Sequence, residues 1–297
     1  MNTVHDGAIT DELTQSARLI DSRRIGAILI DEGKLRIQDA ERIIYAQKEQ
    51  GLRFGEAAVA LGLVSESDIQ RALSRQHDYP YLLPNESKVS RKLSAAYEPF
   101  GKQGEALRAL RSQLLLRWFS GEAERRTLAV VSADRGDGRS VLAANLAVAF
   151  SQLGESTLLI DADMRHQTQH ALFSLDNRVG LSAILSHRAD LDAAEPIPAF
   201  ENLFVLPTGA VPPNPQELLS RPQFAQLLEQ AAARFEVVLI DTPSTNQYAD
   251  AQTIAVRASG ALLVTRKNRT RLRDADALAQ TLTRLSAHMV GAVINEF

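Results

Sequence analysis

Acidic side chains follow two short apolar runs of this 297-residue chain. Leu158–Ile160 leads into an Asp-x-Asp-x-Arg motif that begins at Asp161. Val237–Ile240 leads into an Asp-Thr-Pro motif that begins at Asp241. A carboxylate at the tip of a buried strand is costly unless a cation or hydrogen bonds receive its charge. Magnesium bound to a triphosphate is such a cation, so the two motifs predict chemistry on a metal–nucleotide complex.

A glycine-rich loop precedes both motifs. Residues 132–140 read Ser-Ala-Asp-Arg-Gly-Asp-Gly-Arg-Ser and separate the apolar run Leu128–Val131 from a helical pattern. A strand, glycine loop and helix in this order direct backbone N–H groups at anionic phosphates. The P-loop pattern ends in Gly-Lys-Ser/Thr, whereas Arg139 replaces the lysine here and Ala133 opens the pattern. Alone, the loop could equally be a glycine turn entering a helix; the carboxylate motifs favour phosphate binding.

Apolar runs alternate with helical patterns from this loop to the end of the chain. Runs that are apolar on both faces indicate a buried parallel sheet, with ligands at the carboxyl ends of its strands. We therefore predict an α/β, P-loop NTPase-like fold with a mostly parallel sheet flanked by helices, preceded by a small helical N-terminal domain. The expected strands are Leu128–Val131, Thr157–Ile160, Leu203–Leu206, Val237–Ile240, Ala261–Val264 and Val290–Ile294, and the expected helices include Ser140–Leu153, Pro215–Arg234 and Asp274–Leu285.

The three motifs, in this order, resemble the Walker A, A′ and B motifs of the bacterial tyrosine kinases. The segment Pro212–Leu219 is similar to one typical of the capsular polysaccharide regulators. The ending Gly291–Phe297 resembles the chain-length-determinant tyrosine kinases of exopolysaccharide operons. This resemblance covers roughly Glu105 to Phe297. It implies a tyrosine autokinase or ATPase that uses ATP and Mg²⁺ and regulates exopolysaccharide chain length and export.

The resemblance also implies a role for each motif residue. Asp161 would orient or deprotonate the attacking hydroxyl, while Ser140, Asp163 and Asp241 would hold magnesium. Arg165 would reach phosphate or anchor a neighbouring subunit, and Asn295 would touch the adenine. The implied catalytic residues are Asp161, Asp163, Asp241 and Arg139, and the implied ATP-binding residues are Gly136, Asp137, Gly138, Arg139, Ser140, Val141, Arg165 and Asn295.

Two features depart from the family pattern. Arg139 keeps the charge of the P-loop lysine but is a planar fork, which predicts weakened transfer. The five tyrosines form no terminal cluster of the kind that family kinases often carry as an autophosphorylation substrate. A catalytically weak nucleotide-binding adaptor is therefore the second hypothesis. A ParA- or MinD-like ATPase ranks third, because its signature lysine would fall at Asp134.

A 24-residue pattern occurs twice near the N-terminus, at residues 24–47 and 53–76. Each copy predicts two short helices joined at a glycine that needs a positive φ. Ser65 can cap the second helix of the second copy with Asp68, whereas Arg36 in the first copy cannot. The residues in common include four exact matches, Arg24 with Arg53, Gly26 with Gly55, Gly33 with Gly62 and Gln47 with Gln76.

The repeat resembles the MshEN form of the N-terminal domain of type II secretion and type IV pilus ATPases, which binds cyclic di-GMP. Arginine can fork to phosphate or stack on a base, and glycine admits close backbone approach. The alternative is a helical module that only docks a partner protein. The implied ligand residues are Arg24, Gly26, Leu29, Gly33, Gln47, Arg53, Gly55, Gly62 and Gln76, although Ala58 stands where the first copy has Leu29.

A helix is expected from about Glu105 to Trp118. Its Glu105, Arg108 and Arg111 form an E-x-x-R-x-x-R motif on one face. Such a charged face is commonly just solvated, but the motif matches the one through which bacterial tyrosine kinases form rings, so we expect a subunit contact. The expected organisation is a flexible N-terminus over 1–18, the MshEN-like domain over 19–83, a linker over 84–100 and the P-loop domain over 101–297.

Composition limits the remaining partners. The formal net charge is −3 and no long basic run stands out, so nucleic acid is not an expected partner. The absence of cysteine excludes disulfides and thiolate metal sites. The sequence shows no signal peptide and no apolar run of about 20 residues. We expect a self-associating cytoplasmic protein, peripheral to the inner membrane through a chain-length-determinant (Wzz-type) membrane protein.

Overall fold

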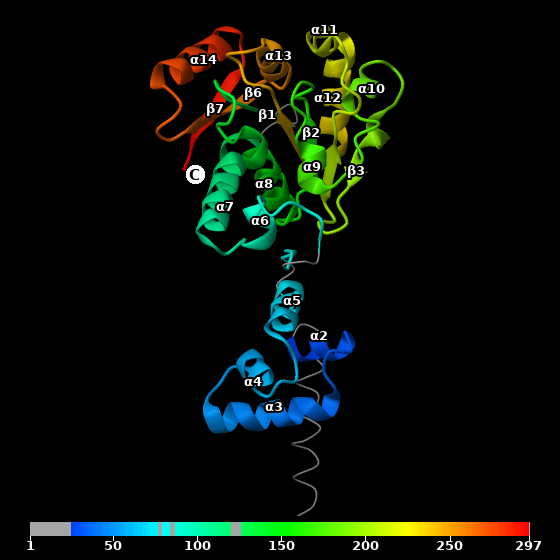
Figure 1. The fold of residues 1–297 in the computed structure, drawn as a ribbon, viewed down its shortest axis with the longest axis vertical. Helices are drawn as coiled ribbons and strands as arrows, with labels where there is room; N and C mark the ends of the chain where they lie inside the picture. Colours follow the sequence, from blue (N-terminus) through cyan, green and yellow to red (C-terminus); the bar gives the residue numbers. More distant parts are fainter. Residues whose placement is uncertain (1–24, 77–78, 84–86, 120–125, 297) are drawn as a thin grey trace, which may run out of the picture. The chain divides into compact units, whose positions relative to one another are not determined.

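The computed structural model describes residues 25–76, 79–83, 87–119 and 126–296. The chain divides between Leu83 and Pro84 into two compact units, which are described separately here as the N-terminal unit and the C-terminal unit (Figure 1). Arg24 and the segment 1–18, for which a ligand role and a flexible terminus were predicted, lie outside the described residues.

The repeat forms two matched helix–turn–helix copies in the N-terminal unit. Gly33 and Gly62 join the helices of each copy at φ values of 68° and 65°, so the predicted left-handed glycines are confirmed. Leu29, Ile43 and Ala57 are fully buried in the core between the copies. The helices are α2 (Ile25–Asp31), α3 (Ile37–Gln50), α4 (Phe54–Ala60) and α5 (Glu66–Gln76).

The two copies differ at the start of their second helices. Ser65 Oγ accepts the Asp68 N–H at 3.2 Å, and the Asp68 carboxylate accepts the Ser65 N–H at 3.1 Å. This reciprocal cap is the predicted one. In the first copy Arg36 occupies the N-cap of α3 without a side-chain hydrogen bond, also as predicted.

A seven-stranded sheet in the order β3-β4-β2-β5-β1-β6-β7 organises the C-terminal unit. All neighbours are parallel except β3 and β4. The predicted α/β class and all six predicted strands are confirmed; the short edge strand β3 was not predicted. The strands are β1 (Thr127–Val131), β2 (Thr157–Asp161), β3 (Glu195–Pro196), β4 (Leu203–Leu206), β5 (Val237–Asp241), β6 (Gly260–Arg266) and β7 (His288–Asn295).

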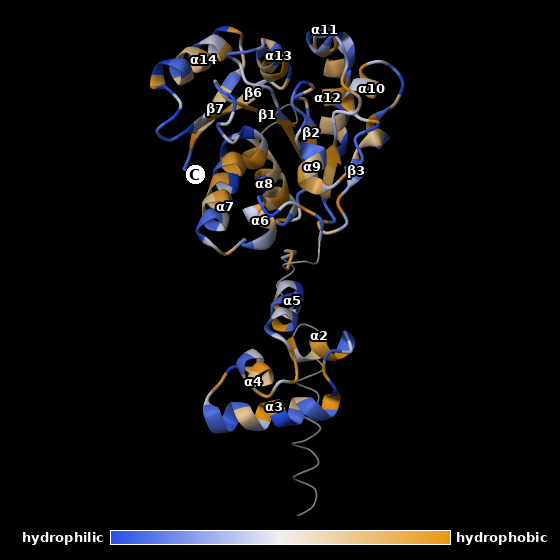
Figure 2. Cartoon of the chain, viewed as in Figure 1, coloured by the Kyte–Doolittle hydropathy of each residue, from blue (hydrophilic) through white to orange (hydrophobic). Residues whose placement is uncertain are grey.

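Helices cover both faces of this sheet (Figure 1). Every residue of β1, β2 and β5 is buried, which explains why these runs are apolar throughout rather than alternating. Helix α8 is itself largely buried. Figure 2 shows that it is mostly apolar. The helices are α6 (Ser94–Tyr97), α7 (Lys102–Leu114), α8 (Arg139–Ser151), α9 (Gln169–Phe173), α10 (Leu181–Ile184), α11 (Pro215–Ser220), α12 (Pro222–Arg234), α13 (Asp250–Arg257) and α14 (Leu272–Arg284), with a π-helical turn η1 (Leu115–Phe119) and a 3₁₀ turn η2 (Leu191–Ala193).

One predicted helix is in fact two. The pattern over Pro215–Arg234 breaks at Arg221, which has the extended conformation φ −69°, ψ 155°. Pro222 causes the break, because proline disfavours the helical conformation in the residue before it and starts a new helix readily.

The expected linker is partly a strap on the C-terminal unit. We call residues 87–97, which include α6, the strap. Asn145 of α8 accepts the Ala95 N–H at 2.9 Å, and Gln152, the C-cap residue of α8, donates to the Ala95 carbonyl at 2.9 Å. The Ser90 N–H donates to the Leu172 carbonyl of α9 at 2.8 Å. The prediction of a linker over 84–100 is therefore wrong for the strap. The polar composition of the strap suggested irregular structure and did not indicate its hydrogen bonds to α8 and α9.

Candidate functional site

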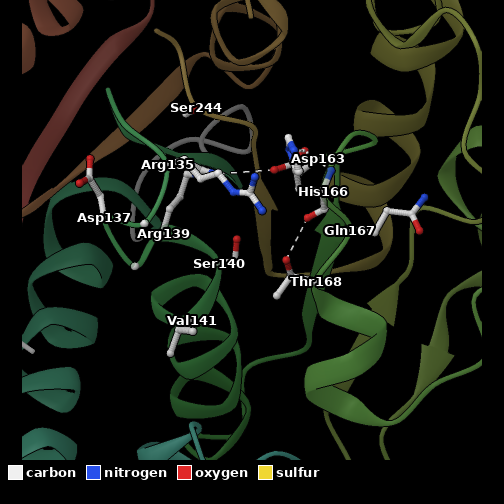
Figure 3. Close-up of a pocket in the computed structure, with 12 residues that line it drawn as sticks. Arg135, Asp137, Arg139, Ser140, Val141, Asp163, His166, Gln167, Thr168 and Ser244 are labelled. Atoms are coloured by element: carbon white, nitrogen blue, oxygen red, sulfur yellow. Dashed lines mark hydrogen bonds and ion pairs between the residues drawn. The ribbon is translucent and has the colours of Figure 1, made fainter. Parts of the chain in front are cut away.

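The three predicted motifs meet at one edge of the sheet. Strands β2, β5 and β1 are neighbours, and Asp161 is paired in register with Asp241. Since the strands are parallel, their carboxyl ends lie together with the glycine loop that follows β1. A cavity of about 400 Å³ opens there (Figure 3), lined by Arg135, Gly136, Asp137, Gly138, Arg139, Ser140, Val141, Asp163, His166, Gln167, Thr168 and Ser244.

The glycine loop is held in shape by its own side chains and by the far end of the sheet. Gly136 and Gly138 have φ values of 88° and 90°, which glycine adopts without strain. The buried Asp137 carboxylate accepts the Asp134 N–H and the Thr270 hydroxyl. Asn295 Nδ2 donates to the Asp137 carbonyl at 2.8 Å. Asn295 thus fixes the loop, and its contact with adenine stays a prediction.

Arg139 turns inward from the first residue of α8. Only 7% of the residue is exposed, and Nη1 donates to Ser132 Oγ at 2.6 Å. Its guanidinium also lies 3.5 Å from Asp163 Oδ2 and 3.6 Å from Asp241 Oδ1. Figure 3 shows the side chain pointing from the loop toward Asp163. The predicted catalytic residues Arg139, Asp163 and Asp241 are thus brought together.

Burial dominates the electrostatics of the two strand-end carboxylates. Burial, followed by the nearby Asp241 charge, raises the pKa of Asp161 to about 8. Hydrogen bonds from the N–H groups of Gln169 and Thr168 lower this pKa and so oppose the rise. Burial likewise raises the pKa of Asp241, and Arg139 opposes the rise. Asp161 Oδ2 accepts the N–H groups of Thr168 and Gln169 at 3.0 and 2.9 Å, so it also caps α9.

Arg165 does not reach the cavity. Its Nε donates to Asp250 Oδ2 at 2.8 Å, and its guanidinium lies 3.9 Å from the centre of the Tyr248 ring. Asp250 is 1% exposed, and the arginine neutralises it. The nearer buried carboxylate holds the Arg165 side chain in this structure, and its contact with phosphate or another subunit stays a prediction.

Several site residues were missed from the sequence. Gln169 is fully buried and donates from Nε2 to Asp241 Oδ2 at 2.8 Å and to the Ser140 carbonyl at 3.1 Å. Arg269 Nη2 donates to the Arg135 carbonyl at 3.3 Å. The signal for Arg269 was the high density of Lys and Arg over residues 266–273. No motif or pattern in the sequence around Gln169 indicates a role at the site.

The E-x-x-R-x-x-R motif divides into exposed and buried members. Glu105 is exposed on α7 and forms an ion pair with Arg108, whose side chain is 20% exposed. Arg111 is 8% exposed and donates to the Ala149 carbonyl of α8 at 2.8 Å. The prediction that Arg111 lies at a subunit contact is wrong, because this side chain fastens α7 to α8.

The predicted ligand residues of the repeat also divide. Leu29 is fully buried in the core and Gly26 lies within α2, so neither presents a surface. Gly55 has a packing role, since a Cβ there would lie 2.9 Å from Ile69 Cγ2. Arg53 is exposed at the N-cap of α4, and Gln47 Nε2 donates to the Leu52 carbonyl at 3.4 Å. Gln76 ends α5, and its Oε1 is buried without a hydrogen-bond partner among described residues.

The residues at the cavity fit a magnesium–nucleotide complex. Asp161 Oδ1 and Asp241 Oδ1 are buried and accept no hydrogen bond from the described residues. Within the described part of the chain, no three His, Cys, Asp or Glu side chains are placed to hold a metal by themselves. Mg²⁺ usually combines one or two carboxylates with water and phosphate oxygens, so this donor set suits Mg²⁺ carried on a phosphate. The fold and site together define a P-loop-type nucleotide-binding protein.

Comparison with known proteins gives the family. A family model described as ATPase MipZ matches residues 127–287. Tyrosine-protein kinase YwqD of Bacillus subtilis is 35% identical over 209 residues, which are 70% of this chain and 87% of that protein. The kinase domain of Escherichia coli tyrosine kinase ETK is 30% identical with a TM-score of 0.67, covering 72% of this chain and 82% of that one. The chain belongs to the bacterial tyrosine kinase family.

A more distant likeness is to a protein that was solved with a nucleotide. The septum site-determining protein MinD of Pyrococcus horikoshii, solved with Mg-ADP, is 25% identical with a TM-score of 0.51 and covers 57% of this chain and 70% of that one. The predicted ParA- or MinD-like alternative is thus a fold neighbour at lower similarity. Separately, no helix among the described residues is both long and apolar enough to cross a bilayer.

Proposed function

We propose that this protein transfers the γ-phosphoryl group of ATP to tyrosine in a magnesium-dependent reaction. The observation that carries the proposal is the meeting of three groups at the ends of adjacent strands. The glycine loop and Asp163 line one cavity, and the fully buried Asp241 lies beside them, within 3.6 Å of the loop residue Arg139. Membership of the tyrosine kinase family supports the choice of phosphoryl acceptor.

The chain's own groups supply positioning and charge. Bound Mg-ATP would provide the transferable group and neutralise its developing charge. The N–H groups of residues 136–140 would hold phosphate at the start of α8, with the Ser140 hydroxyl beside Asp241 as a metal ligand. Asp161 is the candidate for orienting or deprotonating the tyrosine hydroxyl, because its raised pKa makes its ionised form more basic than an ordinary carboxylate.

The competing function is a nucleotide-binding adaptor with weak or no transfer, favoured by Arg139. Incubation with Mg-ATP and a Glu/Tyr copolymer separates the two, because the kinase yields phosphotyrosine over many turnovers whereas the adaptor yields little or none. Arg139→Lys should raise transfer if the arginine fork is what slows it, since lysine offers phosphate a compact charge. Transfer that stays flat or falls in Arg139→Lys would show that the loop is adapted to arginine.

The biological setting proposed for this activity is exopolysaccharide chain-length control. In it, the protein works in the cytoplasm, self-associates through the Glu105–Arg108 face and is recruited by a Wzz-type membrane protein. Glu105→Arg should reduce self-association without disturbing the buried Arg111 contact. Analytical ultracentrifugation checks this, with Asp192→Arg, an exposed acidic residue on another surface, as the control.

Cyclic di-GMP sensing by the N-terminal unit is a second proposed function. Its support is the folding of both copies into the same helix–glycine–helix unit, with Arg53 exposed at the start of α4. Titration of the full chain with cyclic di-GMP, using cyclic di-AMP as the control ligand, tests it. Arg24→Ala and Arg53→Ala should each weaken binding about tenfold or more, whereas the exposed, unrepeated Arg36→Ala should not. Absent or non-selective binding would leave the repeat as a protein-docking module.

A further inference from the structure

Arg139 lies where the proposed site expects a cation. One guanidinium contacts three partners through three different nitrogens. Nη1 donates to Ser132 Oγ, Nη2 lies 3.5 Å from Asp163 Oδ2 and Nε lies 3.6 Å from Asp241 Oδ1. Both carboxylates assigned to magnesium are therefore already paired with a positive charge from the phosphate-binding loop.

The contacts with the two carboxylates are ion pairs rather than hydrogen bonds. Their distances exceed the usual N–H···O range, and Arg139 Nε and Asp241 Oδ1 are buried without hydrogen-bond partners among the described residues. Removing one member of a buried pair is strongly unfavourable, because the other charge is left alone. The arginine thus neutralises the carboxylates, but an anion that forms true hydrogen bonds with the guanidinium can displace it from them.

We infer that Arg139 is the internal counter-ion of the Asp163–Asp241 pair, and that Mg²⁺ enters this site only together with nucleotide phosphate. The inference deepens the proposed function and rests on its phosphate site. Phosphate oxygens offer the guanidinium a charge-assisted, two-pronged partner, and its departure frees both carboxylates for the cation. Nucleotide and Mg²⁺ then bind with positive coupling, each raising the other's affinity by the same factor.

Arginine suits this role better than the lysine of the usual pattern. A lysine ammonium is a single charged atom, so it cannot place separate nitrogens against Ser132, Asp163 and Asp241 at once. The substitution at position 139 therefore changes how the empty acidic pair is neutralised as well as how phosphate is held.

Thermal unfolding of the full chain tests the inference without any activity measurement. The wild type is measured in chelator, in Mg²⁺ alone, in ADP alone and in Mg²⁺ with ADP. We expect Mg²⁺ alone to change the Tm by less than about 1 °C, and Mg²⁺ with ADP to raise it by more than ADP does. A wild-type chain that Mg²⁺ alone stabilises strongly would overturn the inference.

Arg139→Gln should convert the pair into a metal site that needs no nucleotide. In chelator its Tm should fall by roughly 6 °C or more, because two buried carboxylates lose their counter-ion. Mg²⁺ alone, at a hundredfold excess over its Kd, should then restore about 5 °C. Mn²⁺ alone should likewise bind one site in Arg139→Gln and none in the wild type, as seen by electron paramagnetic resonance.

Arg165→Gln is the matched control. It also removes the partner of a buried carboxylate, Asp250. Unlike Asp163 and Asp241, however, Asp250 is one carboxylate rather than one of a pair that could hold a metal. It should lose stability without gaining a response to Mg²⁺ alone. An equal metal response in Arg165→Gln and Arg139→Gln would overturn the inference.

The double variant Arg139→Gln/Asp241→Asn keeps the test decisive if Arg139→Gln does not fold. With one carboxylate neutralised it should regain stability and show no response to Mg²⁺ alone; a response would contradict the inference. The proposed function is tested separately, because the metal response of Arg139→Gln is measured without nucleotide. The proposed function fails if the wild type binds no nucleotide and phosphorylates no tyrosine.

Discussion

Gln169 joins helix α9 to the end of strand β5, through a 2.8 Å hydrogen bond from its Nε2 to Asp241 Oδ2. The same nitrogen donates to the Ser140 carbonyl in the first turn of α8. Asp161, at the end of β2, holds the start of α9 through the Gln169 N–H. Gln169 therefore links three elements: its side-chain amide joins α8 to the end of β5, and its backbone N–H contacts the end of β2.

Gln169→Leu should weaken both the fold and magnesium–nucleotide binding. Leucine has a similar volume but leaves the Ser140 carbonyl and an Asp241 oxygen without their partner, at a cost of about 1–3 kcal/mol. Urea unfolding measures the stability and calorimetry with Mg-ADP measures the affinity. Gln280→Leu, an exposed glutamine on α14, is the control. If both measurements match the wild type, the bridging role is wrong.

Asp241→Asn should weaken magnesium-dependent nucleotide binding while the sheet remains folded. The substitution keeps the shape of the side chain and removes a charge that faces the cation site. Calorimetry of ATP binding with and without Mg²⁺ gives the metal contribution, which should shrink about tenfold or more in the variant. ATP binding that is equal with and without Mg²⁺, and the same in Asp241→Asn, would remove Asp241 from the metal site.

Arg36→Ser should stabilise the N-terminal unit. Position 36 is the N-cap of α3, has no side-chain hydrogen bond, and precedes Asp39 by three residues. Serine there would reproduce the reciprocal cap that Ser65 and Asp68 form on α5, worth about 0.5–2 kcal/mol. Urea unfolding monitored by the helical circular dichroism signal checks this. Arg42→Ser, in mid-helix, should stabilise nothing, and a gain in both variants would argue against a capping effect.

Acid should weaken the cap at Ser65. The Ser65 side chain, as the main cause, holds the pKa of Asp68 below its ordinary value of 3.8. The stabilisation is therefore complete above pH 3.8 and is lost as the pH falls through the lower pKa of the folded state. Carboxyl carbon chemical shifts follow this titration. Ser65→Ala should move the Asp68 midpoint upward; an unchanged midpoint would contradict the role of the hydroxyl.

Local patterns predicted the elements that depend on local physics. The strands of the sheet were found because β1, β2 and β5 are apolar at every position, as burial on both faces requires. Gly33, Gly62 and the Ser65 cap were found because turn and cap chemistry is set within a few residues. The meeting of Asp161 with Asp241 followed from the parallel sheet.

Contacts between distant residues account for the roles that the local sequence did not show. Arg165 pairs with Asp250, 85 positions away, and Asn295 binds the Asp137 carbonyl, 158 positions away. The charge of Arg111 favours a surface position, and the sequence does not indicate its hydrogen bond to the Ala149 carbonyl of α8. In each case the residue type is compatible with the predicted role and with the observed contact, and the observed contact can be seen only in the fold.

The strap sets where this chain can be cut or exchanged. Asn145 and Gln152 hold Ala95 from the buried helix α8, whose first residue is Arg139. A recombinant C-terminal fragment that starts at Glu105 would lack the whole strap, including Leu93 and Ala96, which are both fully buried. It would also leave the Asn145 and Gln152 side-chain amides without their partners on Ala95. Domain shuffling during evolution faces the same constraint, so a new N-terminal module would have to join the chain before residue 87.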